Sequence, residues 1–184
     1  MGCLYKVLAK VLTKRLHGEI RSVVSDSQSA IVKGKQILDD ILIANEAVDE
    51  ARCMGKELLM FKVDFEKAHD SVDFKYLDSV MVNMNFPTIW RKWISECIGT
   101  TTTSVLVNGS LIEEFPIGRD LRQGDPLSPF LFLLVAEGFN VLINAMVGAQ
   151  MFKGFGVGRN GVVKLTHLQF ADDTLITGEK CWLN

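Results

Sequence analysis

The chain has 184 residues, of which 48% are hydrophobic and 23% are charged, and its formal net charge is −2. These values exclude a disordered chain and a uniformly basic nucleic-acid-binding protein, and the length allows one domain or a domain with a smaller lobe. The four cysteines are scattered without a CxxC pair, which indicates thiols in a reducing compartment rather than a disulfide framework or a zinc site.

The first predicted element is an amphipathic helix over residues 5–16. Its apolar residues recur with helical spacing and predict one buried face: Leu4, Val7, Leu8, Val11, Leu12 and Leu16. Lys6, Lys10 and Lys14 lie four residues apart, so they form a basic stripe on this helix. Residues 1–35 carry seven basic and two acidic side chains, which suits a surface that holds a polyanion. The stripe is a candidate nucleic-acid-binding surface, although most such stripes are only solvated faces.

The middle of the chain is predicted to mix helices and strands. The predicted elements are a helix over 36–53, a strand over 58–63 that ends at Asp64, helices over 74–84 and 87–98, a β-hairpin over 104–112 and a helix over 129–147. Asn108-Gly109 is typical of the turn of a hairpin. Glu137 and Asn140 interrupt the apolar sequence of the last predicted helix, which favours a core helix of a soluble protein over a membrane span. We therefore expect an α+β fold with an antiparallel sheet backed by helices.

An acidic pair lies near the end of the chain, between two short apolar runs. Residues 165–177 read Leu-Thr-His-Leu-Gln-Phe-Ala-Asp-Asp-Thr-Leu-Ile-Thr, which predicts a β-hairpin with Asp172 and Asp173 at its tip. Adjacent carboxylates repel each other, so a fold that presents them together usually does so for a cation. Together with Asp64 they would supply the three carboxylates of a two-metal phosphoryl-transfer site. A lone Asp-Asp is more often a solvated turn, so this interpretation depends on the rest of the chain.

Three segments follow one another in an order that resembles a known family. They are Lys62-Val-Asp64-Phe-Glu-Lys-Ala-His69-Asp-Ser-Val-Asp73, Leu121-Arg122-Gln123-Gly124-Asp125-Pro126-Leu127-Ser128-Pro129 and Phe170-Ala-Asp172-Asp173. Together they resemble motifs A, B and C of reverse transcriptases, most closely those of non-LTR (LINE-type) retrotransposons. Gln28-Ser-Ala and Gly34-Lys-Gln-Ile-Leu-Asp are similar to the fingers region of that family. The resemblance implies a right-hand polymerase fold, with a mainly helical fingers-like segment over residues 1–55, a palm-like segment over residues 56–184 and no thumb.

The resemblance also implies roles for individual residues. Asp64, Asp172 and Asp173 are the implied catalytic residues, which would hold two Mg²⁺ ions, or Mn²⁺, with the carbonyl of Phe65 as a further ligand. The implied contacts of the incoming nucleotide are Lys35, Ala68, His69, Arg122, Gln123 and Gly124. Lys35 stands where the family usually has an arginine, and a lysine lacks the bidentate fork. His69 stands where the family usually has a tyrosine or phenylalanine that excludes ribonucleotides.

Two interpretations of function fit the sequence. The resemblance implies an RNA-directed DNA polymerase that adds deoxynucleoside triphosphates to the 3′-hydroxyl of a DNA primer on an RNA template. The alternative is a catalytically inactive retrotransposon remnant, or a weak nucleic-acid-binding module that uses Lys6, Lys10 and Lys14. The N-terminus has no apolar signal-peptide core, so we expect a soluble intracellular protein, in the nucleus or cytoplasm by the family's life cycle.

Overall fold

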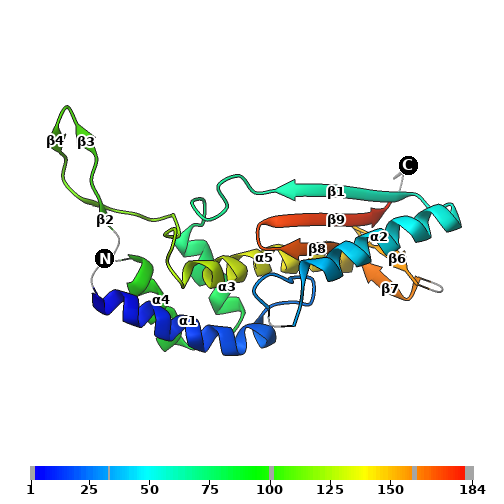
Figure 1. The fold of residues 1–184 in the computed structure, drawn as a ribbon, viewed down its shortest axis with the longest axis horizontal. Helices are drawn as coiled ribbons and strands as arrows, with labels where there is room; N and C mark the ends of the chain where they lie inside the picture. Colours follow the sequence, from blue (N-terminus) through cyan, green and yellow to red (C-terminus); the bar gives the residue numbers. More distant parts are fainter. Residues whose placement is uncertain (1–2, 33, 100–101, 159–160, 181–184) are drawn as a thin grey trace. The chain divides into compact units, whose positions relative to one another are not determined.

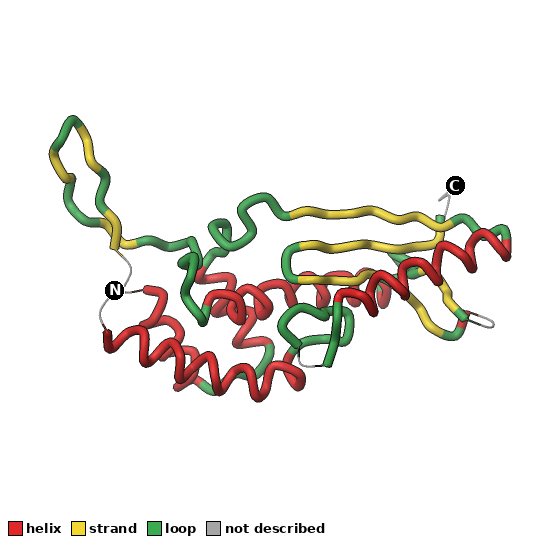
Figure 2. Tube along the Cα trace, viewed as in Figure 1, coloured by secondary structure: helices red, strands yellow, loops and turns green. Residues whose placement is uncertain are grey.

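The computed structural model describes residues 3–32, 34–99, 102–158 and 161–180 (Figure 1). Its elements are α1 (Cys3–Val23), α2 (Ile37–Met54), β1 (Leu58–Asp64), α3 (Phe74–Asn83), α4 (Thr88–Gly99), β2 (Thr102–Thr103), β3 (Leu106–Val107), β4 (Ser110–Leu111), β5 (Phe115–Pro116), α5 (Ser128–Gly148), β6 (Phe155–Val157), β7 (Val163–Leu165), β8 (His167–Phe170) and β9 (Asp173–Glu179). Figure 2 shows helices in red and strands in yellow along the same trace.

The chain divides into two compact units, and each is built from two separate stretches of sequence. Met1–Val23 and Lys67–Val135 form what we call the helical unit, and Val24–Glu66 and Ala136–Asn184 form what we call the sheet unit. The predicted fingers-like and palm-like segments divide the chain near Gly55 instead. The predicted division describes functional parts of a polymerase. Contacts between residues do not test such functional parts, so the division near Gly55 stays a prediction.

In the helical unit, α1 buries a different face from the predicted one. Ala9, Leu12, Leu16 and Ile20 are buried, at the three- and four-residue spacing of a helix. The prediction was right for Leu12 and Leu16 but wrong for Leu4, Val7, Leu8 and Val11, which are between 45% and 75% exposed. The apolar residues of α1 are spread over most of its circumference. Hydrophobic periodicity alone therefore does not select the side of the helix that packs against the protein.

Two short segments of the helical unit run beside each other ahead of α3. The N–H of Leu121 donates to the carbonyl of His69 at 3.0 Å, and the N–H of Asp120 donates to Val72 at 3.3 Å. Asp73 then begins α3, because its carboxylate accepts the free N–H groups of the first turn. These bonds hold residues 69–73 against residues 118–121.

The predicted hairpin around Asn108-Gly109 is confirmed. β3 pairs with β4 in antiparallel register, and both turn residues have positive φ, 50° at Asn108 and 82° at Gly109. Two positive φ angles are the requirement of a type I′ turn, which asparagine and glycine meet best.

The sheet unit contains a three-stranded antiparallel sheet in the order β1-β9-β8. A second ribbon, β6–β7, and helix α2 share a small core with this sheet. The buried members of that core are Ala47, Ala51, Phe155, Leu165 and Leu168. A Gln36–Asp39 capping box begins α2, and Gly55 ends it in the left-handed conformation with φ of 61°.

Helix α5 is, within the described residues, the one helix that is long and apolar enough to cross a membrane. Half of its most apolar stretch is nevertheless buried inside the protein. Its polar residues have partners, since Asn140 donates to Glu137 at 2.6 Å and Glu137 accepts the N–H of Ser25 at 2.9 Å. This arrangement is consistent with the core helix of a soluble protein.

Candidate active site

The predicted acidic hairpin is formed by β8 and β9. Phe170 pairs with Asp173, so Ala171 and Asp172 make a two-residue turn. Ala171 has φ of +54° and Asp172 does not have a positive φ, which is the pattern of a type II′ turn. On the other side of β9, the strand β1 ends with Asp64 opposite Asp173. The fold therefore pairs Asp64 with Asp173 across two neighbouring strands and places Asp172 in the adjoining turn.

A lysine already supplies positive charge to these carboxylates. The Nζ atom of Lys62 lies 2.9 Å from Oδ1 of Asp173. Lys62 and Asp64 are two residues apart on β1, so they share one face of the strand. The hydrogen bond with Asp173 is the main cause of a raised pKa at Lys62, and the charges of Asp64 and Asp172 raise this pKa further. All three carboxylates thus act on the same ammonium group.

The donor chemistry of this site fits Mg²⁺ or Mn²⁺, because the three carboxylates offer oxygen ligands and one of them, Asp173, already pairs with a cationic group. In the part of the chain that the structure describes, no three His, Cys, Asp or Glu side chains converge closely enough to hold a metal ion. Lys62 and Asp173 both line an open hollow of about 250 Å³ between α2 and the sheet.

Phe65, the predicted carbonyl ligand, follows β1 directly. Its ring packs edge-on against Phe139, with 6.3 Å between the centroids, and Phe139 packs in the same way against His167 at 5.8 Å. His167 is buried, and this burial lowers its pKa below the usual value of 6.5. The three rings fix the backbone just beyond Asp64.

In the helical unit, the loop before α5 is held by Tyr5. The hydroxyl of Tyr5 donates to the carboxylate of Asp125, and the guanidinium of Arg122 lies over the Tyr5 ring, 5.1 Å from its centroid. Burial and the bond to Asp125 raise the pKa of Tyr5. Asp125 also accepts the N–H of Leu127 at 2.9 Å. The side chain of Arg122 is therefore positioned by an aromatic face, as is common for arginine.

Gln123 and Gly124 are exposed in this loop. Gly124 has φ of +77°, which favours glycine, and a Cβ atom there would have nothing within 4 Å. A close approach to a base pair, predicted from the resemblance, stays a prediction. Ala68 is buried and the His69 ring packs on Phe132 at 4.7 Å, so both residues lie beside the start of this loop.

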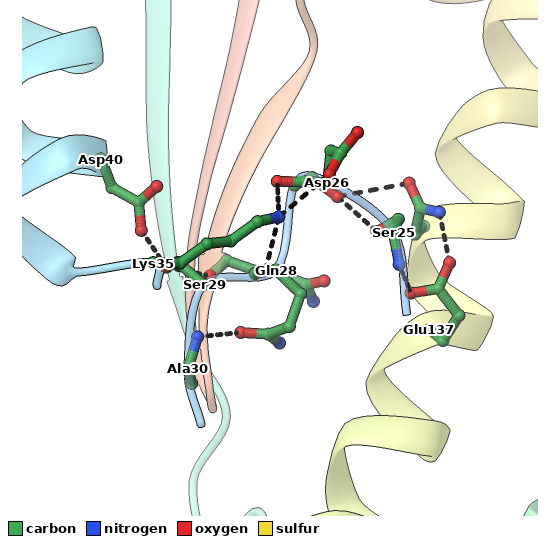
Figure 3. A network of polar contacts seen from close by, with 11 residues as sticks. Ser25, Asp26, Gln28, Ser29, Ala30, Lys35, Asp40 and Glu137 are labelled. Atoms are coloured by element: carbon green, nitrogen blue, oxygen red, sulfur yellow. Dashed lines mark hydrogen bonds and ion pairs between the residues drawn. The ribbon is translucent and has the colours of Figure 1, made fainter. Parts of the chain in front are cut away.

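Lys35, the predicted triphosphate contact, belongs to the sheet unit. Figure 3 shows its side chain beside Asp26 and Gln28. Its Nζ atom donates to the carbonyl of Asp26 at 2.7 Å and to that of Gln28 at 3.2 Å, and it lies 3.3 Å from the Asp26 carboxylate. The predicted nucleotide-binding residues thus fall into two groups, Lys35 in the sheet unit and the others in the helical unit. Lys6, Lys10 and Lys14 are exposed on α1, as the spacing predicted.

Three residues that contact predicted functional segments of the two units were not predicted to have structural roles. Lys62 had a signal, since it stands two residues before Asp64 on a strand. Gln28 lay in a segment that supported the resemblance but had no assigned role. Tyr5 had no signal, because its bond to Asp125 joins residues 120 positions apart.

Comparison with known proteins relates the chain to one family. Residues 1–180 match the family described as "Reverse transcriptase (RNA-dependent DNA polymerase)". The chain is 27% identical over 175 residues to the transposon TX1 uncharacterized 149 kDa protein of Xenopus laevis, and 27% identical over 176 residues to a retrovirus-related Pol polyprotein from type-1 retrotransposable element R2 of Popillia japonica. Each match covers 95% of this chain, but the chain spans only 13% and 24% of those proteins.

The fold is also similar to a solved structure of telomerase from Candida albicans in complex with a fragment of telomeric RNA. The TM-score is 0.58 at 10% sequence identity, and the match covers 95% of this chain and 30% of the telomerase chain. At this identity the similarity concerns the fold alone. It confirms the predicted α+β polymerase fold.

Proposed function

Because the chain belongs to the reverse transcriptase (RNA-dependent DNA polymerase) family, we propose that it extends a DNA primer on an RNA template by two-metal nucleotidyl transfer. Its relatives include retrotransposon proteins, which confirms the resemblance predicted from the three motifs. The polymerase activity, the nucleic-acid partners and the deoxynucleoside triphosphate substrate are part of the proposal, since the chain spans a minor part of those relatives.

The observation that carries the proposal is the position of three carboxylates at adjoining strand ends. Asp64 lies opposite Asp173 in the β1–β9 register, and Asp172 occupies the turn next to Asp173. Two bound Mg²⁺ ions would lower the pKa of the primer 3′-hydroxyl and stabilise the pyrophosphate leaving group. In this proposal Asp64, Asp172 and the carbonyl of Phe65 provide oxygen ligands, and Asp173 provides another after it releases Lys62.

Other residues bind the nucleotide in this proposal. Lys35 carries a positive charge for the triphosphate, Arg122 is a further contact of the nucleotide, and the exposed Gln123-Gly124 backbone contacts the new base pair. His69 takes the place of the residue that excludes a ribose 2′-hydroxyl. Because histidine is smaller and more polar than tyrosine or phenylalanine, we expect weak discrimination between deoxyribonucleotides and ribonucleotides.

Primer extension on an RNA template with Mg²⁺ tests the proposal. The parent chain is compared with an Asp172→Asn, Asp173→Asn variant and with a Glu113→Gln, Glu114→Gln variant that loses the same two charges elsewhere. Extension by the parent and the Glu variant, with none by the Asp variant, is the expected result. Equal extension by all three proteins, or no Mn²⁺ binding by the parent in an electron paramagnetic resonance titration, would contradict the proposed mechanism.

The second candidate function, nucleic-acid binding without catalysis, follows from the exposed lysine stripe on α1. In that case a Lys6→Ala, Lys10→Ala, Lys14→Ala variant loses RNA retention, whereas Asp64→Asn retains it. Binding through lysines also weakens steeply as salt rises, because counterions released from the phosphates drive it. Filter binding of the two variants at two salt concentrations tests this function.

A further inference from the structure

The N–H group of Ala171 needs a hydrogen-bond partner that the hairpin itself does not provide. In a two-residue hairpin the ladder bonds join the residues that flank the turn, and the N–H of the first turn residue points away from them. Ala171 is half-buried, so leaving this group without a partner would be costly. The side chain of Gln28 meets the need, because its Oε1 atom accepts the N–H of Ala171 at 3.2 Å.

Gln28 is itself held firmly in place. Residues 27–29 run parallel to β8: the N–H of Gln169 donates to the carbonyl of Ser27 at 2.8 Å, and the N–H of Ser29 donates to the carbonyl of Gln169 at 3.0 Å. The Gln28 side chain is 1% exposed, and its Oε1 atom also accepts the N–H of Ala30 at 3.0 Å. Figure 3 shows this carboxamide folded back toward Ala30.

Of the two polar atoms in the buried Gln28 amide group, only the oxygen has hydrogen-bond partners within the described residues. Its Nε2 atom is buried and has no hydrogen-bond partner within the described residues. A buried donor without a partner destabilises the folded protein, so an apolar side chain would fill the same space better. The observed contacts assign the compensating role to Oε1, which joins the loop at Ala30 to the acidic turn at Ala171.

We propose that Gln28 is a positioning residue that fixes the Ala171-Asp172 turn, and with it the carboxylate of Asp172, through the N–H of Ala171. The role of the turn rests on the proposed function, in which Asp172 is a metal ligand. Gln28 does not touch the reacting atoms and acts only through the turn. Residues that orient metal ligands in this way typically change metal affinity or activity by about 10- to 100-fold when they are replaced.

Two substitutions and one control test the proposal in the full chain. Gln28→Met keeps the length of the side chain and removes the acceptor, whereas Gln28→Glu keeps an acceptor oxygen at the same position. Ser29→Ala is the control, because Ser29 is equally buried and bonds to the Gln169 carbonyl at 3.1 Å but not to the turn. The measurements are amide hydrogen exchange at Ala171 by nuclear magnetic resonance and Mn²⁺ affinity by electron paramagnetic resonance.

We expect Gln28→Met to speed exchange at Ala171 by at least about 10-fold and to weaken Mn²⁺ binding by about 10-fold or more. Exchange at Leu175, in the middle of β9, should stay the same, and Gln28→Glu should restore slow exchange at Ala171. Unchanged exchange at Ala171 in Gln28→Met would overturn the proposal, as would an equal increase in Ser29→Ala. If the parent binds no Mn²⁺, the proposed function fails, while exchange at Ala171 still decides whether Gln28 holds the turn.

Discussion

Replacing Ala171 by glycine should stabilise the protein, although glycine usually destabilises. Ala171 has φ of +54°, and its Cβ atom makes this left-handed conformation unfavourable. Glycine adopts the same conformation without that strain, and its N–H can still donate to Gln28. The substitution therefore removes strain from the turn that carries Asp172 while leaving its hydrogen bond intact.

Two opposing effects set the size of the change. The left-handed conformation costs a residue with a Cβ atom about 1–2 kcal/mol. Glycine loses more backbone entropy on folding, which costs about 0.5–1 kcal/mol. The net gain is then between zero and about 1.5 kcal/mol, and a domain of this size gains about 2–4 °C in melting temperature per kcal/mol. Thermal unfolding followed by circular dichroism should show a rise of up to about 6 °C.

The same substitution on α5 provides the control. Ala145 is exposed in the last turn of this helix and has an ordinary helical backbone. Ala145→Gly should therefore lose up to about 1 kcal/mol and lower the melting temperature by up to about 4 °C. A fall in melting temperature for Ala171→Gly similar to that of Ala145→Gly would refute the reasoning, because it would mean that the turn is not strained at Ala171.

Lys62→Gln should raise the affinity for Mn²⁺ severalfold in an electron paramagnetic resonance titration, because Asp173 then has no ammonium to release. Burial lowers the pKa of His167, so the unfolded chain binds a proton more readily than the folded protein; stability to urea should fall as the pH drops below 6.5 and level off below the folded-state pKa. Tyr5→Phe should lower the free energy of unfolding by about 1–2 kcal/mol in urea, because Asp125 loses a hydrogen-bond donor.

Each of these predictions has a matched control. Lys164→Gln also removes a lysine that pairs with a carboxylate of β9, Glu179 at 3.6 Å, and should leave Mn²⁺ affinity unchanged. His167→Phe should lose the part of the acid sensitivity that His167 causes, and equal sensitivity in both proteins would contradict the prediction. For Tyr5→Phe, an unfolding free energy equal to that of the parent would show that the bond to Asp125 contributes nothing.

Local features of the fold followed from the sequence. The Asn108-Gly109 turn and the acidic turn at Asp172 depend on residues close together in the chain, and both are where the sequence predicted them. The carboxylate pairing was harder, because Asp64 and Asp173 are 109 positions apart and the proposed grouping of the three carboxylates depended on the rest of the chain. No local pattern fixes the register of two strands that distant in sequence.

Contacts between segments that are far apart in the chain could not be predicted in the same way. The sequence indicated that α1 is amphipathic, but it did not show that the buried side would centre on Ala9. Nor did it show that residues 27–29 would extend the sheet beside β8 and direct Gln28 toward Ala171. Such contacts depend on the packed arrangement of distant segments, which hydrophobic periodicity does not encode.

The position of β1 has a practical consequence for work with this protein. Within the described residues, β1 pairs with β9 on one side only, and Leu59 and Phe61 are more than half exposed. An open, apolar strand edge is a template on which another copy of the chain can add a strand, and a charged residue in such a strand opposes this self-association. Lys62 is the sole charge among residues 58–63. Lys62→Gln should therefore aggregate more readily than the parent, and its metal titrations require dilute protein whose monomeric state is checked by light scattering.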